Sequence, residues 1–445
     1  MDKHTMTTPV AKEIVEKHLA SMGITDMSKA TIRELSRLAS EVERESGQEF
    51  IHMEMGVPGL KPSEIGVEAE VKALREGCAQ KYPPVDGFPD LKRAVSLFVK
   101  NFIGVEVSPE GCVPTVGSMQ GGMAAFLLVN RCKAGHDRVL FIDPGFPVQK
   151  TQLRILGMEY DTFDVYNYRG GKLHDKLESY LKKGRTSAIL YSNPNNPSWV
   201  CLTEEELETI GKLSRQYDVP IVEDLAYFCM DFRKDLSKPG EPPYQPTVAR
   251  YCDKWIMLIS GSKAFSYAGQ RIGTLVVSDT LRTTKYEELA KYFPSDVFGR
   301  ALVYGAMYGL SSGVASSVQR GFTALLEAAN AGKYDFVNEV REYGRRAEKM
   351  RSIFEKYGFK VVYDRDGDVP LANGFYFTLS YPGLNGGELL RALIEFGVSV
   401  ISLGSTGSER TEGLRACVSH VPPTQYELLV SRMAAFQNMY GGTRQ

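Results

Sequence analysis

The sequence lacks the features that mark membrane-spanning or secreted proteins. No stretch approaches the roughly 18 consecutive apolar residues that a membrane-spanning helix needs. The first thirty residues are mixed and polar, without the apolar core of a signal peptide. The seven cysteines are scattered, none forms a Cys-x-x-Cys pair, and their number is odd. This argues against a disulfide framework and against a zinc site. We therefore expect a cytoplasmic protein without a membrane segment or a bound metal.

A large excess of charge of one sign is also missing. The chain has 53 lysines and arginines against 54 aspartates and glutamates, a formal net charge of −1. Such a balance provides no basic field to hold nucleic acid or an anionic membrane, so we expect neither as a partner. The 445 residues exceed what one hydrophobic core of usual size supports. The length predicts two domains, or one large α/β domain with an appendage.

The middle of the chain alternates short apolar runs with helix-like segments. The runs cover 138–144, 187–194, 219–227 and 254–262, and each is almost continuously apolar. Such runs are typical of strands that are buried on both faces. Between the second and the third lies an amphipathic segment in which Thr203 and Glu206 form a capping box. The pattern predicts an α/β fold with a mostly parallel sheet flanked by helices.

The last ~110 residues differ from the middle of the chain in composition and in the pattern of expected helices and strands. A long polar helix over 333–358 is followed by expected strands at 359–364, 374–380 and 398–404, with a helix at 386–397. An amphipathic helix over 31–45 lies near the other end. Because chain ends often meet, we predict a small α+β domain built from both of them. The expected division is an N-terminal segment 1–60, a large domain 61–328 and a small domain 329–445.

Polar residues follow each apolar run. Phe146 comes soon after the first run and Asn196 after the second, while Asp224 and Tyr227 end the third. Ligands of open parallel sheets bind outside the carboxyl ends of the strands. An Asn-Pro turn or a capping aspartate is usually only structural, but the convergence of these residues on one sheet edge predicts a ligand site there.

Two glycine- and serine-containing segments complete this edge. Residues 260–273 read SGSKAFSYAGQRIG, which places Lys263 among small residues directly after the fourth run. Gly117 and Ser118 open an expected helix, and the N-terminus of a helix can bind a phosphate. A Gly-Ser turn before a helix is common, so this second signal is weak when taken alone.

These residues together resemble a known family. Ser260, Ser262, Lys263 and Arg271 match its S-x-S-K motif and following arginine, in order with the D-x-x-Y of 224–227 and the N-N-P of 195–197. The chain is similar to the fold-type I pyridoxal-phosphate enzymes, and among them to the class I and II aminotransferases related to aspartate aminotransferase. The similarity extends from MEMGVPGLKP at 53–62 to GLRACVS at 413–419.

The resemblance implies a role for each matching residue. Lys263 is expected to form a Schiff base with pyridoxal 5′-phosphate and to move the proton of the substrate, with Asp224 and Tyr227 as further catalytic residues. Asp224 would pair with the pyridine nitrogen. The expected cofactor-binding residues are Ser118, Met119, Phe146, Asn196, Asp224, Tyr227, Ser260, Ser262, Lys263, Arg271 and, in the neighbouring subunit's site, Tyr82.

The resemblance also implies substrates and an assembly. Arg415 is expected to bind the α-carboxylate of an amino acid or a 2-oxo acid, with Gly56 and Asn196 beside it. Tyr82 implies a homodimer with shared active sites. The chain departs from the family at Ser198 and Trp199, where threonine and glycine are usual. No motif identifies a second arginine for a dicarboxylate substrate, although Arg300 and Arg320 are candidates; the segment 283–320 is expected to line the side-chain pocket.

Three functions compete at this point. The first is a ping-pong aminotransferase that moves an amino group between an L-amino acid and a 2-oxo acid. The second is a β-eliminating C–S lyase that uses the same cofactor and the same residues. The third is a regulator that uses the fold only as a sensor, but just ~50 residues precede the similar region and they contain no basic recognition helix. We favour the aminotransferase.

Overall fold

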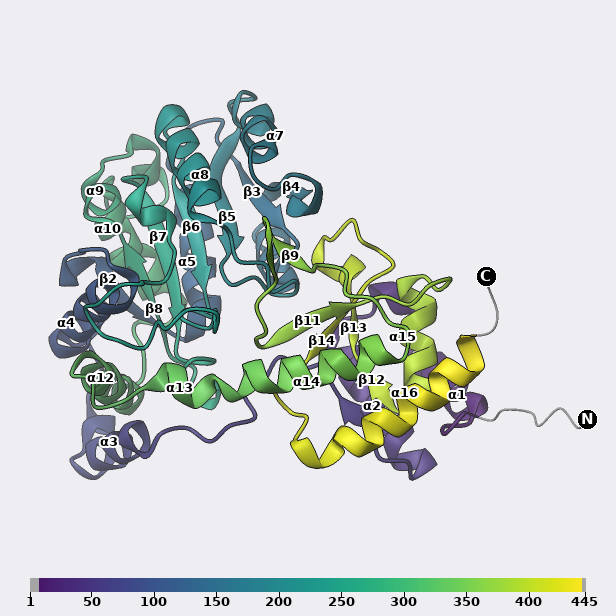
Figure 1. The fold of residues 1–445 in the computed structure, drawn as a ribbon. Helices are drawn as coiled ribbons and strands as arrows, with labels where there is room; N and C mark the ends of the chain where they lie inside the picture. Colours follow the sequence, from purple (N-terminus) through teal and green to yellow (C-terminus); the bar gives the residue numbers. More distant parts are fainter. Residues whose placement is uncertain (1–7, 442–445) are drawn as a thin grey trace, which may run out of the picture.

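The computed structural model describes residues 8–441, and a seven-stranded sheet forms its largest element. The strand order is β2-β8-β7-β6-β5-β3-β4 (Figure 1). Only β8 runs against its neighbours, so the predicted mostly parallel sheet is confirmed. The strands are β2 (Cys112–Thr115), β3 (Arg138–Asp143), β4 (Glu159–Asp164), β5 (Thr186–Ser192), β6 (Ile221–Leu225), β7 (Trp255–Ser260) and β8 (Gly273–Val277).

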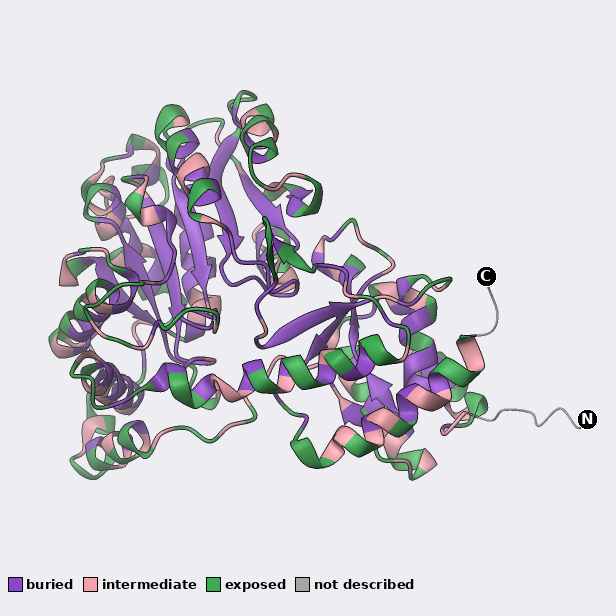
Figure 2. Ribbon diagram, in the orientation of Figure 1, coloured by how far each residue is buried: buried purple, intermediate pink, exposed green. Residues whose placement is uncertain are grey.

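The four apolar runs form strands β3, β5, β6 and β7, and apolar cores cover both faces of the sheet. Leu140 and Ile142 of β3 belong to one core, whereas Val139 and Phe141 belong to the other. This alternation follows from the period of two residues in a strand. Figure 2 shows the inner strands β5, β6 and β7 buried along their length, whereas the edge strand β4 has exposed residues. Runs without polar alternation were therefore the correct signal for this sheet.

Helices flank the sheet and recur through the rest of the described chain (Figure 1). The amphipathic segment between the second and third apolar runs forms α8, and its capping box between Thr203 and Glu206 is present. The helices are α1 (Lys12–Ser21), α2 (Ile32–Ser46), α3 (Glu64–Arg75), α4 (Pro89–Phe98), α5 (Gly117–Val129), α6 (Pro147–Ile155), α7 (Lys172–Leu181), α8 (Glu204–Tyr217), α9 (Asp279–Thr283), α10 (Phe298–Ala301), α11 (Tyr308–Leu310), α12 (Ser316–Asn330), α13 (Phe336–Val340), α14 (Glu342–Lys356), α15 (Gly386–Glu395) and α16 (Tyr426–Tyr440). None of the helices within residues 8–441 has the length and hydropathy needed to span a bilayer.

A third hydrophobic core joins the two ends of the chain. It combines residues of α1 and α2 with residues of α14, α15 and α16. The strands beside it are β1 (Ile51–His52), β9 (Arg365–Asp366), β10 (Val369–Pro370), β11 (Tyr376–Leu379), β12 (Val398–Ser399), β13 (Ile401–Ser402) and β14 (Leu414–Cys417). We call these elements the small lobe, and the elements from α3 to α13 the large lobe. The first and the last helix of the described residues, α1 and α16, both belong to the small lobe (Figure 1).

The division into 1–60, 61–328 and 329–445 stays a prediction, and Phe336 and Val337 of α13 share a core with the large lobe. The first seven and last four residues lie outside the described part of the chain. The expected helix over 333–358 is interrupted at Arg341, between α13 and α14. Figure 1 shows α14 running from the large lobe along the small one.

The strand predicted at 359–364 is wrong. Only Lys360 forms a strand-like bridge, to Ser380. Farther along, the backbone N–H of Tyr363 donates to the side-chain hydroxyl of Thr378 (2.9 Å) instead of to a strand. The Tyr363 phenol donates to the carboxylate of Asp164 in the large lobe (2.8 Å). These two hydrogen bonds of Tyr363 take the place of regular strand pairing in this apolar segment.

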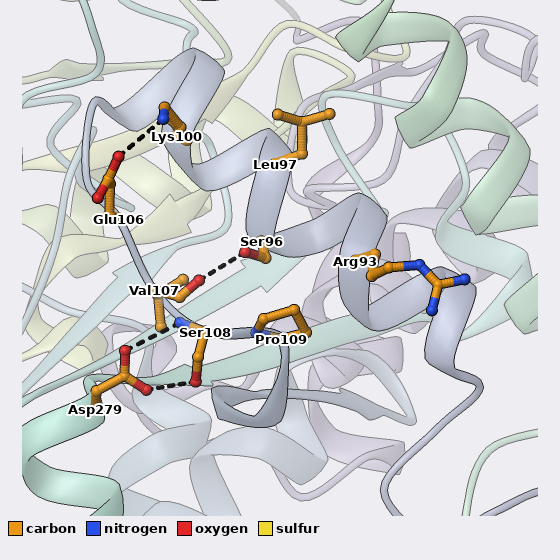
Figure 3. Close-up of a pocket in the computed structure, with 9 residues that line it drawn as sticks. All are labelled: Arg93, Ser96, Leu97, Lys100, Glu106, Val107, Ser108, Pro109 and Asp279. Atoms are coloured by element: carbon orange, nitrogen blue, oxygen red, sulfur yellow. Dashed lines mark hydrogen bonds and ion pairs between the residues drawn. The ribbon is translucent and has the colours of Figure 1, made fainter.

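A surface hollow of about 520 Å³ lies between α4 and the loop before β2 (Figure 3). Lys100 pairs with Glu106 at its rim (2.8 Å), and the carboxylate of Asp279 accepts hydrogen bonds from Ser108. None of the residues predicted for the ligand site lines this hollow. The predicted ligand site therefore lies elsewhere, at the strand ends.

Candidate active site

Lys263 lies at the end of β7 and reaches the small lobe. The backbone N–H of Ser262 donates to the hydroxyl of Ser260 (3.1 Å), which turns the chain after the strand. The Lys263 ammonium donates to the carbonyl of Gly56 and lies 5.5 Å from the ring centroid of Phe375. Burial lowers the pKa of Lys263 to about 8, and the charges of Arg415 and Arg271 act in the same direction. The amine is thus unusually easy to deprotonate.

Asp224 ends β6 and is buried without a cation beside it. Its carboxylate accepts hydrogen bonds from the side-chain amide of Gln149 (2.8 Å) and from the backbone N–H of Ala226 (3.1 Å). Burial raises the pKa of Asp224 to about 6, although both hydrogen bonds oppose this. A positive charge next to this carboxylate would lower its pKa again.

Tyr227 lies one turn beyond Asp224 and pairs with a tyrosine of the small lobe. Its hydroxyl is 2.6 Å from the hydroxyl of Tyr376, and both side chains are buried. The ring of Trp199 meets both phenols edge-on, with ring centroids 5.5 Å from Tyr227 and 6.1 Å from Tyr376. The phenol predicted for the site therefore touches the small lobe directly.

Arg415 lies on β14 and is only 2% exposed. It donates to the side-chain carbonyl of Asn196 (3.1 Å) and to the backbone carbonyl of Glu54, and its guanidinium lies 4.5 Å from the ring centroid of Tyr376. Its Nε has no hydrogen-bond partner, and no carboxylate of residues 8–441 forms an ion pair with it. A buried guanidinium without a counterion fits a site for an added carboxylate.

The first turn of α5 and the ends of β7 and β8 converge. Gly273 lies opposite both Thr115 and Ser260 in the sheet, so these three strand ends are in register. A Cβ atom at Gly273 would lie 3.1 Å from the backbone nitrogen of Ser118. At Gly117, whose φ is +66°, a Cβ atom would lie 2.6 Å from a guanidinium nitrogen of Arg271. The first-turn N–H groups, including those of Ser118 and Met119, have no acceptor within the helix.

Two predicted residues are less closely tied to this group. Phe146 directly precedes α6 and is half-buried. Tyr82 is 94% exposed in the loop before α4. The other predicted residues come from the ends of β5, β6, β7 and β8, from the start of α5, and from the small lobe.

Sequence reasoning missed four residues of this site: Glu54, Gln149, Trp199 as a neighbour of Tyr227, and Tyr376. Gln149 lies on α6 only three residues after Phe146, but no motif distinguishes it. The signal for Trp199 was its position after N-N-P, where glycine is usual. Its φ of 63° is in the left-handed region, which explains why glycine suits this position.

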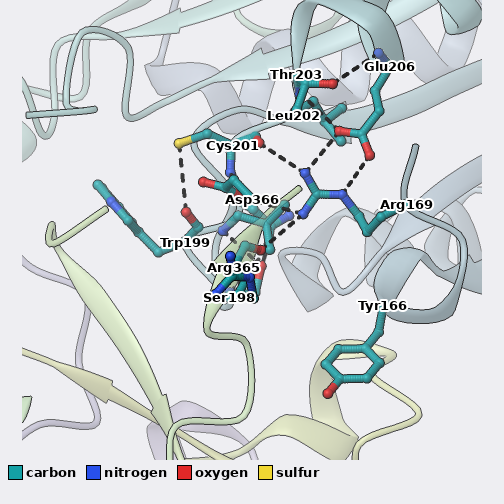
Figure 4. Close-up of polar contacts among 12 residues, drawn as sticks. Tyr166, Arg169, Ser198, Trp199, Cys201, Leu202, Thr203, Glu206, Arg365 and Asp366 are labelled. Carbon is teal, nitrogen blue, oxygen red and sulfur yellow. Dashed lines mark hydrogen bonds and ion pairs between the residues drawn. The ribbon is translucent and has the colours of Figure 1, made fainter. Parts of the chain in front are cut away.

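An ion-pair cluster fixes the two lobes beside the site (Figure 4). Arg169 makes two hydrogen bonds to Glu206 (2.7 and 2.9 Å), the residue that also caps α8. Asp366 of the small lobe accepts from the backbone N–H of Cys201 (3.0 Å) and from Arg233 (2.9 Å). The indole of Trp199 points away from Arg169 in this view. The cluster therefore holds the 196–201 loop against the small lobe.

A family comparison identifies the chain. The model of the family described as "Aminotransferase class I and II" matches residues 49–433. The chain belongs to this family. Class I and II aminotransferases depend on pyridoxal phosphate.

The individual class I and II aminotransferases that match this chain are only distantly similar to it in sequence. The glutamate–pyruvate aminotransferase AlaC of Escherichia coli is 28% identical over 59% of this chain and 63% of its own length. The LL-diaminopimelate aminotransferase of Natranaerobius thermophilus is 25% identical over 77% of this chain and 79% of its own. A double mutant of the Thermus thermophilus aspartate aminotransferase superposes with a TM-score of 0.72 at 20% identity, covering 95% of this chain and 98% of that one. The aligned stretch thus spans under two thirds of AlaC, and the structural likeness shows the shared fold.

The residues present fit the cofactor of the class I and II aminotransferases. Glycines at 117 and 273 leave space that any side chain would fill, next to the N–H of Ser118 and the guanidinium of Arg271. These donors suit a phosphate. The hydrogen-bond partners of the buried Asp224 are the neutral groups of Gln149 and Ala226. A cationic ring nitrogen would balance the charge of this carboxylate. Lys263 provides the amine.

Proposed function

We propose that the chain is a pyridoxal-phosphate-dependent aminotransferase that moves an amino group between an L-amino acid and a 2-oxo acid. The observation that carries this proposal is the guanidinium of Arg415, which is buried and has no ion-pair partner within the described residues. Arg415 donates to the carbonyl of Glu54. Two residues further on, the carbonyl of Gly56 accepts a hydrogen bond from the Lys263 amine. An amino acid carries the matching groups, a carboxylate beside a reacting carbon. The planar fork of arginine holds a carboxylate in one orientation.

Lys263 would act on the proton of the substrate. With a pKa of about 8, a useful fraction of the amine is neutral near pH 7 and accepts a proton, and the ammonium then returns it. Arg415 would bind the carboxylate of the donor first and of the 2-oxo acid second, so one site serves both half-reactions. Tyr227 and Asn196, which contact Tyr376 and Arg415 of the small lobe, would supply further hydrogen bonds.

The same proposal names the residues that hold the cofactor. Pyridoxal phosphate supplies an aldehyde for amines and a ring that takes up an electron pair. Asp224 would hold the ring nitrogen, Phe146 would stack on the ring, and Tyr227 and Asn196 would donate to the ring oxygen. The phosphate would be bound by Ser118, Met119, Ser260, Ser262 and Arg271. Gly56 would lie beside the substrate, where its carbonyl already binds Lys263.

Arg300 and Arg320 are the two candidates for binding the side-chain carboxylate of a dicarboxylate substrate. Arg320 is engaged within its own chain, because it pairs with Asp90 and stacks on Phe88 at 3.9 Å. Arg300 lies 6.0 Å from the ring of Tyr304 in the 283–320 segment and forms no ion pair within the described residues. We therefore propose that Arg320 does not select dicarboxylates and that Arg300 is the remaining candidate.

We also propose a homodimer with shared sites. Tyr82 is 94% exposed although it is aromatic, and three tyrosines of the 283–320 segment are 60% to 63% exposed: Tyr292, Tyr304 and Tyr308. Large exposed aromatic side chains are typical of surfaces that bind a partner. Tyr82 would reach the phosphate of the neighbouring subunit. Light scattering of the purified protein checks the dimer, and a monomer with full activity would contradict the shared site.

A cytoplasmic location remains part of the proposal. All seven cysteines are free thiols, and six of them are buried. Free thiols in this number suit a reducing compartment.

The test of the reaction is a panel of amino acids mixed with the cofactor-loaded protein. The panel begins with glutamate, alanine and LL-diaminopimelate, which the names of the relatives suggest. We expect conversion of the cofactor to its pyridoxamine form and its return on addition of a 2-oxo acid. Pyruvate and ammonia from cystathionine without any acceptor would instead support the C–S lyase.

A further inference from the structure

Tyr376 touches three groups of the proposed site, at Arg415, Tyr227 and Gly56. It begins β11, directly across from Cys417 on β14, and is 1% exposed. Its ring lies under the guanidinium of Arg415, and its hydroxyl is 2.6 Å from that of Tyr227. The same hydroxyl lies 2.0 Å from where a Cβ atom at Gly56 would be, so only glycine leaves room for it.

The ring of Tyr376 restrains Arg415. The guanidinium carbon is 4.5 Å from the ring centroid, within the range of a cation–π contact. The remaining contacts of Arg415 are to the Asn196 amide and to the Glu54 carbonyl, both neutral. An aromatic face stabilises the buried charge without occupying the position of a carboxylate. The ring therefore orients Arg415 without adding a counterion, and the Arg415 Nε has no hydrogen-bond partner.

The hydroxyl of Tyr376 sets the direction of the Tyr227 proton. Each phenol has one proton, so one of the two donates to the other across 2.6 Å. The rings of Trp199 and Phe375 also contact Tyr227, and they offer it no conventional acceptor. When Tyr376 is the donor, the proton of Tyr227 is available to a ligand, and its donation is strengthened because hydrogen bonds in a chain polarise one another.

We propose that Tyr376 is a positioning residue with two separable actions: its ring orients Arg415 toward the substrate carboxylate, and its hydroxyl donates to Tyr227 so that Tyr227 donates to the cofactor. The proposal rests on the proposed function. It assigns substrate binding to the ring and the tuning of the cofactor to the hydroxyl.

Two substitutions separate these actions. Tyr376→Phe keeps the ring and removes the hydroxyl, whereas Tyr376→Leu removes both. The matched control is Tyr381→Phe, a buried tyrosine of the same lobe that packs between Phe359 and Phe436 away from the site. Circular dichroism and thermal unfolding report whether each variant folds; should Tyr376→Leu not fold, Tyr376→Met fills the space without an aromatic face.

The first readout is the pH titration of the visible absorbance of the cofactor-loaded protein without substrate. Tyr227 stabilises the unprotonated form of the chromophore by donating to its ring oxygen, so a weaker donor raises the pKa of this transition. We expect Tyr376→Phe to raise it by about half a unit to one unit, the effect of one hydrogen bond. The control should leave it unchanged.

The second readout separates binding from rate. Tyr376→Phe should lower kcat by about 3- to 10-fold with little change in KM. Tyr376→Leu should in addition weaken binding of an α-methyl amino acid, which cannot lose a Cα proton, by about 3- to 30-fold. An unchanged titration in Tyr376→Phe overturns the action of the hydroxyl, and unchanged binding in Tyr376→Leu overturns that of the ring. If the unmodified protein binds no cofactor and shows no visible band, the proposed function fails instead.

Discussion

Lys263 and Arg415, which come from different lobes, donate hydrogen bonds to carbonyl groups only two residues apart, at Gly56 and Glu54. The short 54–56 stretch thus fixes the spacing between an amine and a guanidinium. That spacing would match the reacting carbon and the carboxylate of one amino acid. It also explains why a segment from the N-terminal end of the chain is part of a site whose other residues lie after position 117.

The covalent role of Lys263 is tested by its removal. In Lys263→Ala, borohydride reduction of the cofactor-loaded protein should leave no cofactor on the peptide that contains residue 263. Activity should fall by at least about 10²- to 10⁴-fold, because the variant also loses the group that moves the proton. Mass spectrometry of the digested protein measures the adduct. Lys212→Ala, which replaces a lysine of α8 whose side chain is 64% exposed, is the control, and an adduct that persists in Lys263→Ala would refute the assignment.

The lowered pKa of Lys263 predicts how cofactor capture depends on pH. The neutral amine is the nucleophile, so the capture rate of the apoprotein should rise about tenfold per pH unit up to about 8 and then level off. A lysine with an ordinary pKa of about 10.4 would continue to gain rate to pH 10. Stopped-flow absorbance between pH 6 and pH 10 gives the midpoint.

The same shift affects the stability of the apoprotein. The pKa of Lys263 is lower in the fold than in the unfolded chain, so the folded state binds fewer protons between pH 8 and 10.5. Stability should therefore rise across this window, relative to Lys263→Met, which lacks the titrating group. Urea unfolding of both proteins at pH 7.5 and pH 10 measures the difference. A constant difference would show that the amine is not shifted.

Arg415 is expected to act on substrates and not on the cofactor. Arg415→Lys keeps the charge but loses the planar fork, which should raise KM for the amino acid by roughly 10- to 100-fold. The dissociation constant of the cofactor should change by less than about threefold. Arg320→Lys is the matched control, since Arg320 is engaged by Asp90. Equal losses of substrate and cofactor affinity in Arg415→Lys would count against the carboxylate role.

Local patterns predicted those parts of the fold that depend on neighbouring residues. The capping box of Thr203 and Glu206 was visible because its two members lie three residues apart. The strands β3, β5, β6 and β7 were visible because burial on both faces leaves continuous apolar runs. Asp224 and Lys263 followed, since each lies at or just beyond the end of such a strand.

Long-range contacts between side chains were outside the reach of these patterns. Tyr376 meets Tyr227 across 149 residues of sequence, and Gln149 meets Asp224 across 75. The mistaken strand at 359–364 has the same cause, because Tyr363 bonds to Asp164, 199 residues away. Position within a β-strand or helix could be read from the sequence, but which side chains meet across the two lobes could not.

The contact between Gly374 and Trp199 gives a test of lobe packing. A Cβ atom at Gly374 would lie 1.9 Å from the indole of Trp199, which is fully buried. Gly374→Ala should therefore destabilise the protein by about 1–3 kcal/mol through overpacking. It should also raise KM for the amino acid, because Tyr376, two residues on, would shift under Arg415. Gly387→Ala is the control, since its nearest neighbours lie at 3.5 Å or more.

A double-mutant cycle tests whether the indole of Trp199 causes the destabilisation by Gly374→Ala. In a Trp199→Leu background the clash is gone, so Gly374→Ala should cost less than about 0.5 kcal/mol. Thermal or urea unfolding of the four proteins gives the coupling free energy. If Gly374→Ala were equally destabilising in both backgrounds, its effect would come from the backbone at position 374 and not from Trp199. A coupling of more than about 1 kcal/mol would show that a tryptophan in place of the usual glycine requires a glycine opposite it in the small lobe.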